Sequence, residues 1–360
     1  MKTWDVIVVG GGIIGLSVAR ELRKQGADVL VVERGEPGRE ASYAAGGMLA
    51  NCGDETPTTL QPLAKASAEM YPEFAHELED ESVMKVDLRS DGTLLFPASE
   101  APIDQITGAS ELPRPLPQLE PELNASGRTA VFLRERSVCP RALTQAALKA
   151  AKHRGVDVAS GTTVTSVEIS GGRAVGVRTD KTAYHAAAIV NCGGAWAGHI
   201  PPVEFPARPV KGQMVCFAMP QREALRHVVR SPEIYLIPRS DGRLLAGATV
   251  EEAGFDKHTV PDTIQRLRRA AIAMLPLLEN ARVLEDWAGL RPGTPDNLPI
   301  LGKTSIPGYF VATGHFRDGI LLAPVTARLM ARVVAGQDSG FDLTPFSTER
   351  FAKDQALKVS

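Results

Sequence analysis

The N-terminal segment of the chain alternates between apolar runs and a cluster of glycines. Val6–Val9 is a continuous apolar run, which is typical of a strand buried on both faces of a parallel sheet. From Ile13 to Lys24 the apolar residues recur at helical spacing, and Gly26 is a good helix stop. Asp28–Glu33 is a second apolar run that finishes on an acid. The pattern therefore predicts a strand, a helix and a second strand in succession.

The rest of the chain shows the same two kinds of periodicity. Patterns at helical spacing predict further helices at 57–81, 142–153, 261–277 and 320–335. Short apolar runs bounded by turn residues predict strands at 156–160, 164–169, 174–179, 183–187, 188–192, 212–218, 233–238, 243–248, 298–300 and 309–312. Residues 86–97 are expected to form a hairpin that turns at Asp91-Gly92. Residues 111–122, rich in proline and acids, are expected to form an irregular connector.

The order of these elements favours one fold class. A β-α-β unit followed by a helix, a meander and an apolar strand that ends on Gly193-Gly194 is typical of FAD-binding doubly wound domains. NAD-binding domains more often repeat βαβ units. We predict an α/β protein, with a Rossmann-like FAD-binding domain and an inserted antiparallel-sheet (α+β) substrate domain. The FAD-binding domain is predicted at 1–80, 138–205 and 288–360, and the substrate-binding domain at 81–137 and 206–287.

Glycines at the first strand–helix junction follow the pattern G-x-G-x-x-G. Gly10 permits a tight turn, Gly12 lets backbone approach a pyrophosphate, and Gly15 lets the helix pack against the strand. The N–H groups and dipole at the helix start attract phosphates. Glu33 can accept hydrogen bonds from ribose hydroxyls, and an acid there favours FAD or NAD over NADP. The glycines alone are weak evidence, but all the parts of a dinucleotide-binding unit occur in order.

Composition and charge narrow the kind of partner. The chain has 360 residues, 44% of them hydrophobic and 23% charged, with a formal net charge of −2. This balance gives no general attraction to nucleic acid or anionic membrane, so we expect a small-molecule partner. No apolar run is long enough to span a bilayer. The four cysteines are scattered without paired spacing, which argues against a metal site or disulfide framework and favours a cytoplasmic location.

Two segments have compositions that suit close approach of backbone to a ligand. Residues 40–50 are dense in Ala and Gly, which fits a place where backbone lies against a flat ligand, although a flexible loop explains them equally well. Residues 314–319, at a predicted strand end, open an apolar helix whose N–H groups would point at a ligand.

Taken together, these pieces resemble the D-amino-acid oxidase superfamily of FAD enzymes, and within it the bacterial glycine oxidases of thiamine biosynthesis. The matching segments run from residue 5 to residue 327. They read VIVVGGGIIGLSVARELRKQGADVLVVER, EASYAAGGMLA, IVNCGGAWAG, IYLIPRSDGRLLAGAT, WAGLRPGTPDNLPILG and GYFVATGHFRDGILLAPVTA. The first is shared by many FAD and NAD proteins, whereas AGLRPGTPD and GHFRDGILLAP are much more specific.

The resemblance implies non-covalent FAD, with its ring at the domain interface and no metal. It places residues 42–49 near the ring, Val164 near adenine, and residues 314–321 near the pyrimidine end of the ring. The implied cofactor-binding residues are Gly10, Gly12, Ile13, Ile14, Gly15, Glu33, Arg34, Ser42, Ala45, Gly46, Gly47, Met48, Val164, Cys192, Gly193, Gly314, His315, Arg317, Asp318, Gly319, Ile320 and Leu321.

The resemblance also implies the substrate contacts. Arg291 and Tyr235 match the residues that hold the substrate carboxylate, and Arg317 matches a second arginine close to the site. A guanidinium fork fits a carboxylate and stays charged at every relevant pH. Other roles remain open: the arginines could pair with Asp286, Asp296 or Asp318, and Tyr235 could be a half-buried strand residue. His315 is rejected as a general base, since this chemistry needs none, and Asp318 is expected at a helix start rather than as an acid catalyst.

The resemblance implies an FAD-dependent oxidase. Glycine, another small amine or a D-amino acid would give a hydride to flavin N5, and the imine would hydrolyse to a 2-oxo acid and ammonia. Molecular oxygen is the expected electron acceptor, yielding hydrogen peroxide. One alternative is a D-amino-acid or 2-hydroxy-acid dehydrogenase of the same fold that passes electrons to a quinone or a protein. Another is a flavin-binding subunit without turnover of its own. A homo-oligomer is suggested only by the resemblance.

Overall fold

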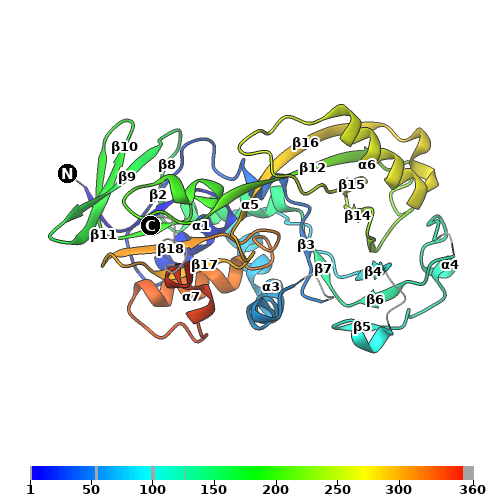
Figure 1. Cartoon of the computed structure of the whole chain (residues 1–360), viewed down its shortest axis with the longest axis horizontal. Helices are drawn as coiled ribbons and strands as arrows, with labels where there is room; N and C mark the ends of the chain where they lie inside the picture. Colours follow the sequence, from blue (N-terminus) through cyan, green and yellow to red (C-terminus); the bar gives the residue numbers. More distant parts are fainter. Residues whose placement is uncertain (1, 53–55, 99–101, 126, 352–360) are drawn as a thin grey trace, which may run out of the picture.

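The computed structural model describes residues 2–52, 56–98, 102–125 and 127–351, and its strands form two eight-stranded sheets and one two-stranded sheet. Figure 1 shows the two large sheets in opposite halves of the molecule. The predicted α/β fold class is confirmed, since parallel and antiparallel pairings both occur. No helix in these ranges is both long enough and apolar enough to cross a membrane.

The first sheet is built around β1 (Thr3–Val9). This strand pairs in parallel with β2 (Val29–Val32) and with β11 (Ala183–Asn191), and α1 (Ile13–Lys24) connects β1 to β2. The sheet continues through β8 (Asp157–Ala159) on one side and through β18 (Tyr309–Thr313) and β17 (Ile300–Lys303) on the other. The predicted strand–helix–strand unit is therefore present at its predicted place.

The meander joins this sheet through one continuous strand. Strands at 183–187 and 188–192 were expected separately, but β11 runs through both, because no turn residue separates them. Its first half pairs antiparallel with β10 (Arg173–Thr179), which in turn pairs with β9 (Val164–Ser170). Its second half pairs in parallel with β1 and ends at Asn191, beside the glycine turn.

Side chains of β1 alternate between two cores. Val6 and Val8 pack against the helix layer, and Ile7 and Val9 pack on the opposite face with the meander. The helix layer comprises α1, α3 (Gln61–Ser82), α5 (Pro140–His153) and α7 (Ala323–Val334). Burial of both faces explains why β1 reads as a continuous apolar run.

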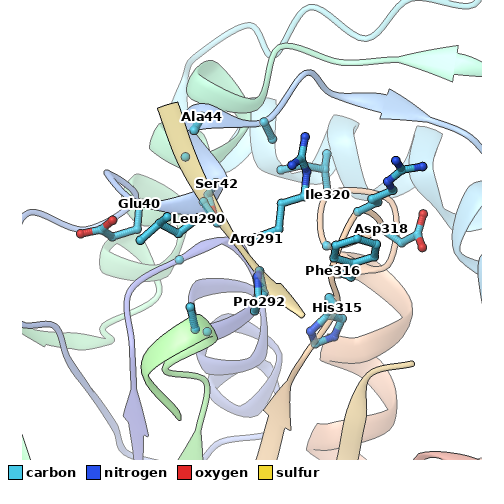
Figure 2. A pocket seen from close by; sticks show the side chains of 18 of the residues that line it. Glu40, Ser42, Ala44, Leu290, Arg291, Pro292, His315, Phe316, Asp318 and Ile320 are labelled. Carbon is cyan, nitrogen blue, oxygen red and sulfur yellow. The ribbon is translucent and has the colours of Figure 1, made fainter. Parts of the chain in front are cut away.

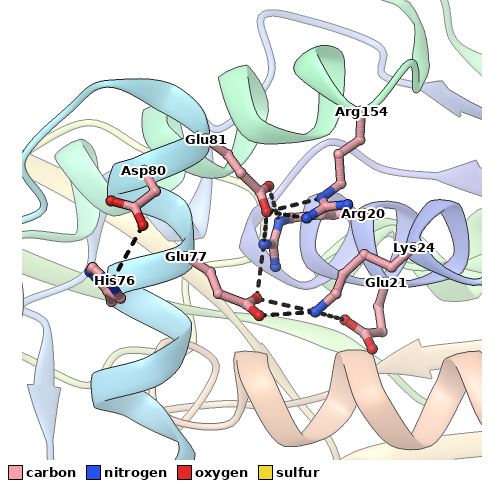
Figure 3. A network of polar contacts seen from close by, with 8 residues as sticks. All are labelled: Arg20, Glu21, Lys24, His76, Glu77, Asp80, Glu81 and Arg154. Carbon is pink, nitrogen blue, oxygen red and sulfur yellow. Dashed lines mark hydrogen bonds and ion pairs between the residues drawn. The ribbon is translucent and has the colours of Figure 1, made fainter.

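A charged network ties three of these helices together (Figure 3). Arg20 of α1 is 2% exposed, and its Nε donates to Glu81 of α3 at 2.6 Å. Arg154, at the end of α5, donates to the same carboxylate through Nε at 3.0 Å. Lys24 and Arg20 both reach Glu77. Burial by itself would raise the pKa of Glu81, but the hydrogen bonds from both arginines lower it to about 2.

The second sheet is largely antiparallel, and α6 (Pro261–Met274) packs on it. Its strands, in spatial order, are β16 (Val283–Gly293), β12 (Arg208–Ala218), β15 (Arg243–Gly247), β14 (Tyr235–Pro238), β13 (Val228–Arg230), β4 (Thr93–Leu95), β6 (Val131–Leu133) and β5 (Ala109–Ser110). Between the large sheets, β3 (Met48–Leu49) pairs with β7 (Arg136–Ser137). The expected connector at 111–122 contains one short helix, α4 (Leu116–Leu119).

The hairpin predicted at 86–97 is wrong. Only β4 forms a strand there, and it pairs antiparallel with β6 and in parallel with β13. Before the turn, Arg89 makes an isolated bridge to Ser137 instead. Asp87 has a left-handed backbone with φ of 54°, which interrupts any strand on that side.

Strands β13 and β16 were not expected from the sequence. β16 pairs with β12 along its length, from Val283 opposite Phe217 to Gly293 opposite Arg208. It therefore crosses the boundary predicted between residues 287 and 288, where the second segment of the substrate-binding domain was expected to end. The division of the chain into two domains stays a prediction.

Candidate active site

A cavity of about 820 Å³ is lined by residues from both large sheets. Its volume lies within the usual range of small-molecule sites, roughly 300–1,000 Å³. The lining runs from the glycine turn and the end of β2, past residues 40–50, to β14, β16 and residues 312–320. Every predicted cofactor residue lines it except Gly15, Gly314 and Leu321.

The glycine turn is too crowded for side chains. A Cβ at Gly10 would lie 2.5 Å from the carbonyl oxygen of Cys192, and one at Gly15 would lie 2.0 Å from that of Gly10. Gly15 therefore serves helix packing, which explains why it lies outside the cavity. Gly12 caps α1 without a side-chain hydrogen bond. The first N–H groups of α1 thus form a cradle that fits a diphosphate.

Two side chains organise this turn. The Glu33 carboxylate, 9% exposed at the end of β2, accepts hydrogen bonds from the N–H groups of Gly11 at 2.7 Å and Gly35 at 2.9 Å. The Ser42 hydroxyl accepts one from the N–H of Ile13 at 2.9 Å. A carboxylate has about four acceptor positions, so Glu33 keeps capacity for ribose hydroxyls.

Trp196 is a cavity residue that sequence reasoning missed. It lies in the short 3-10 helix η3 (Gly194–His199) that follows β11. The Arg34 guanidinium stacks on its ring, with Cζ 3.5 Å from the ring centroid, and also donates to Glu40 at 2.5 Å. An aromatic residue directly after the Gly193-Gly194 strand end was the available signal.

Residues 41–46 pack tightly against β16 and are not a loose loop. A Cβ at Gly289 of β16 would lie 2.2 Å from the Cβ of Ala44. The indole N–H of Trp287 donates to the Ala44 carbonyl at 3.0 Å. The small residues of this segment thus permit a close approach to β16, which argues against a flexible loop, while their approach to a flat ligand stays a prediction.

Arg291 on β16 is held by backbone rather than by a carboxylate. Its Nη1 donates to the carbonyl oxygens of Thr249 at 3.0 Å and Lys211 at 3.3 Å. A Cβ at Gly212 would lie only 2.3 Å from the same nitrogen, so the guanidinium lies flat against the neighbouring strand. Figure 2 shows Arg291 between the segment of Ser42 and the segment of Phe316.

Two of the acids considered as partners of Arg291 are engaged with other residues. Asp286 accepts a hydrogen bond from Thr259 at 2.7 Å, and Asp296 pairs with Arg350 at 2.8 Å. Burial lowers the pKa of Arg291, and the nearby Tyr235 phenol raises it again in part. Tyr235 and Arg317 line the same cavity, and Arg317 is close enough to lower the pKa of Arg291 further.

Comparison with known proteins covers nearly the whole chain. The model of a family described as FAD dependent oxidoreductase matches residues 5–333. The chain belongs to this family. The predicted family and the predicted cofactor, FAD, are thereby confirmed, and the cradle at the start of α1 is of the kind that this cofactor needs.

Relatives within the family agree with the predicted fold. The chain is 35% identical to the Bifunctional protein ThiO/ThiG of Trichormus variabilis, over 98% of this chain and 56% of the relative, so it spans about half of that protein. It is 33% identical to the Glycine oxidase of Pseudomonas aeruginosa, over 95% of this chain and 98% of the relative. The crystal structure of glycine oxidase from Geobacillus kaustophilus superposes with a TM-score of 0.90 at 30% identity, covering 97% and 99% of the two chains.

The segment before α7 differs from the expectation. A helix was predicted from Ile320, but α7 begins at Ala323, and a turn precedes it in which the Leu322 N–H donates to the Asp318 carbonyl at 2.8 Å. Leu321 is buried in the core, where its carbonyl accepts a hydrogen bond from Ser67 of α3 at 2.6 Å. The cavity in this family member is therefore bordered by a turn rather than by the helix end.

Gly314 and His315 of this segment are both predicted cofactor-binding residues, but only His315 lines the cavity. Gly314 has φ of 74° and lies outside the cavity, where a Cβ would meet Thr294 at 2.6 Å. His315 lines the cavity at 3% exposure, with Nε2 3.1 Å from the Thr326 hydroxyl. Burial lowers the pKa of His315 to about 3, so the ring is neutral near pH 7.

Proposed function

We propose that the protein is an FAD-dependent oxidase of glycine, other small amines or D-amino acids, with Arg291 and Tyr235 as the carboxylate anchor. The observation that carries the proposal is the Arg291 guanidinium, which lies in the cavity wall, donates to two backbone carbonyls and stands beside the Tyr235 phenol. Relatives named glycine oxidase, matched over almost their full length, support the choice of substrate class.

The cofactor residues divide by position along the cavity. The diphosphate would lie on the N–H groups of Gly12 and Ile14, beside the Ile13 N–H that donates to Ser42, and the adenosine ribose on Glu33. Val164 would border the adenine. The ring would lie between residues 44–48 and residues 315–320. FAD, when bound, supplies the acceptor for a hydride from the substrate α-carbon.

The chain's own residues would bind and orient the substrate. The Arg291 fork would take both carboxylate oxygens, and the Tyr235 hydroxyl would donate a further hydrogen bond. Two contacts fix the α-carbon at one place, which is the main contribution of a protein to such chemistry. Arg317 adds positive charge to the cavity, and this lowers the pKa of a bound ammonium and favours the neutral amine that can be oxidised. No side chain has to remove a proton from the α-carbon.

An aerobic screen of small amines and D-amino acids tests the proposal. We expect peroxide to form in step with 2-oxo acid, with glycine, sarcosine and D-alanine among the first compounds to examine. Dye reduction under nitrogen without peroxide under air would instead identify the dehydrogenase alternative. Failure of every amine to reduce the bound flavin would refute the proposal. Molecular oxygen as acceptor, a homo-oligomer and a cytoplasmic location remain predictions.

A further inference from the structure

Arg239 is a buried arginine that the proposed chemistry does not use. It follows β14 directly, is 2% exposed and does not line the cavity. Its backbone is fixed at the turn between β14 and β15, where its N–H donates to the Arg243 carbonyl at 2.9 Å and its carbonyl accepts from Gly242 at 3.1 Å. The side chain therefore has little freedom to turn towards solvent.

The charge of Arg239 has no carboxylate partner among the described residues. Its Nη2 donates to the carbonyl of Gly46, and its Nη1 has no hydrogen-bond partner. Two acids are near, but each is engaged elsewhere: Asp87 accepts from Ser240, and Asp241 accepts from Arg243 at 2.8 Å. Burying a cation without an anionic partner lowers the free energy of unfolding, so we expect a functional role for this charge.

The contact with Gly46 sets the direction of one peptide group. In a trans peptide the C=O and the following N–H point in opposite directions. Arg239 lies outside the cavity and holds the Gly46 carbonyl, whereas Gly46 and Gly47 both line the cavity. The N–H of Gly47 therefore points away from Arg239, on the cavity side. The next carbonyl, of Gly47, is likewise held outside, by the Val138 N–H at 2.9 Å.

We propose that Arg239 is a positioning residue, which turns the Gly46–Gly47 peptide so that its N–H faces the flavin ring and whose unpaired charge increases the ring's affinity for electrons. A cation bound to the carbonyl polarises the peptide and strengthens its N–H as a donor. A donor that is preorganised where negative charge develops stabilises the reduced ring. The inference rests on the ring placement proposed above, but not on the identity of the amine.

The test compares three variants of the FAD-loaded full chain. Arg239→Met removes the charge and the donors at similar length. Arg239→Lys keeps the charge. Arg243→Met is the matched control, because Arg243 stands on the same turn but its guanidinium pairs with Asp241. The readouts are the two-electron midpoint potential, sulfite affinity, the visible spectrum of the flavin and the melting temperature.

In Arg239→Met we expect the redox equilibrium constant of the flavin to fall about tenfold, which equals about 30 mV in the midpoint potential of a two-electron couple, and sulfite to bind more weakly. Arg239→Lys should restore most of this loss, and Arg243→Met should leave potential and spectrum unchanged. If Arg239→Met does not fold, Arg239→Gln, which keeps a donor without the charge, is compared with Arg239→Lys. Equal potentials in the neutral and charged variants, or in Arg239→Met and the wild type, would overturn the proposal. Sulfite affinity and the midpoint potential are measured without an amine. If no amine proved to be a substrate, both measurements would still test the role of Arg239.

Discussion

Gly212→Ala should disable the substrate anchor while leaving the cofactor in place. The added Cβ would lie 2.3 Å, 2.4 Å and 2.5 Å from Nη1, Nη2 and Cζ of Arg291, and ordinary contact begins at 3.4 Å. The guanidinium would therefore have to retreat by about 1 Å, a misplacement of the size that can cost about a hundredfold in catalysis. Alanine itself is acceptable in a strand, so the backbone of β12 should be preserved.

The magnitude follows from the bonds that the retreat would disturb. The Nη1 bond to Thr249, now 3.0 Å, would break, and the fork would no longer align with a carboxylate. Hydrogen bonds to charged groups are worth about 1.5–3 kcal/mol, so KM should rise by roughly 10- to 100-fold. Uniform loss of substrate binding raises KM and changes kcat little at saturation.

Steady-state peroxide production against amine concentration measures the effect. Gly35→Ala is the control, since Gly35 does not line the cavity and a Cβ there would meet only Glu33 Oε1, at 3.8 Å. Both variants should bind FAD with the wild-type spectrum. A folded, yellow Gly212→Ala variant whose KM stays within about twofold of the wild type would refute the reasoning, because a twofold change is well below one charged hydrogen bond.

Three further changes test separate parts of the structure. Arg291→Ala should raise KM steeply for every amino-acid substrate while the bound yellow chromophore is retained, as kinetics and absorbance will show. Glu81→Gln should lower stability at neutral pH by about 1–2 kcal/mol, less than the full pKa shift would give because solvent screens part of the network, and should flatten its acid dependence. The folded pKa of Glu81 is about 2 against an ordinary value of 4.5, so its contribution is present above the unfolded pKa and is lost as pH falls towards 2. Val83→Gly should raise the melting temperature by about 2 °C, because Val83, 92% exposed, ends α3 with φ of 55°.

Each of these has a clear contrary result. Unchanged KM in Arg291→Ala would show that the carboxylate is held elsewhere. If the urea midpoint of unfolding changed with pH by the same amount in Glu81→Gln and in the wild type between pH 7 and pH 3, the charged network would add no pH-dependent stability. A lower melting temperature in Val83→Gly would show that the exposed valine makes a contact that offsets its strained backbone. Val250→Gly, at another exposed valine but without positive φ, is the control for loss of a side chain.

Local signals were enough for the first β-α-β unit. The apolar run, the glycines and the helical spacing all lie within thirty residues of one another, and their roles depend on immediate neighbours. The hairpin at 86–97 failed for the opposite reason. Asp91-Gly92 is followed by a real strand, but its partners come from β6 and β13, far away in sequence. Nothing within the segment indicates those pairings.

The site shows the same division. Arg291 and Tyr235 were identified through motifs, although β16, which carries Arg291, was missed because its charges, glycines and proline do not alternate with apolar residues. Gly212 could not have been identified, since its importance depends on a contact with a residue on the neighbouring strand. Arg239 lies within the matching segment IYLIPRSDGRLLAGAT. Only its burial and the Nη1 atom without a hydrogen-bond partner distinguish it from the other arginines, and neither can be read from the sequence.

The contact between Ala44 and Gly289 bears on how substrate preference could evolve. It joins residues 41–44 to the strand that carries Arg291, so under the ring placement proposed above neither side of the site can shift without the other. A larger amine therefore cannot be accommodated by loosening that side. Selection for new substrates should instead alter residues 231–233, where Pro232 and Glu233 border the cavity and are open to solvent.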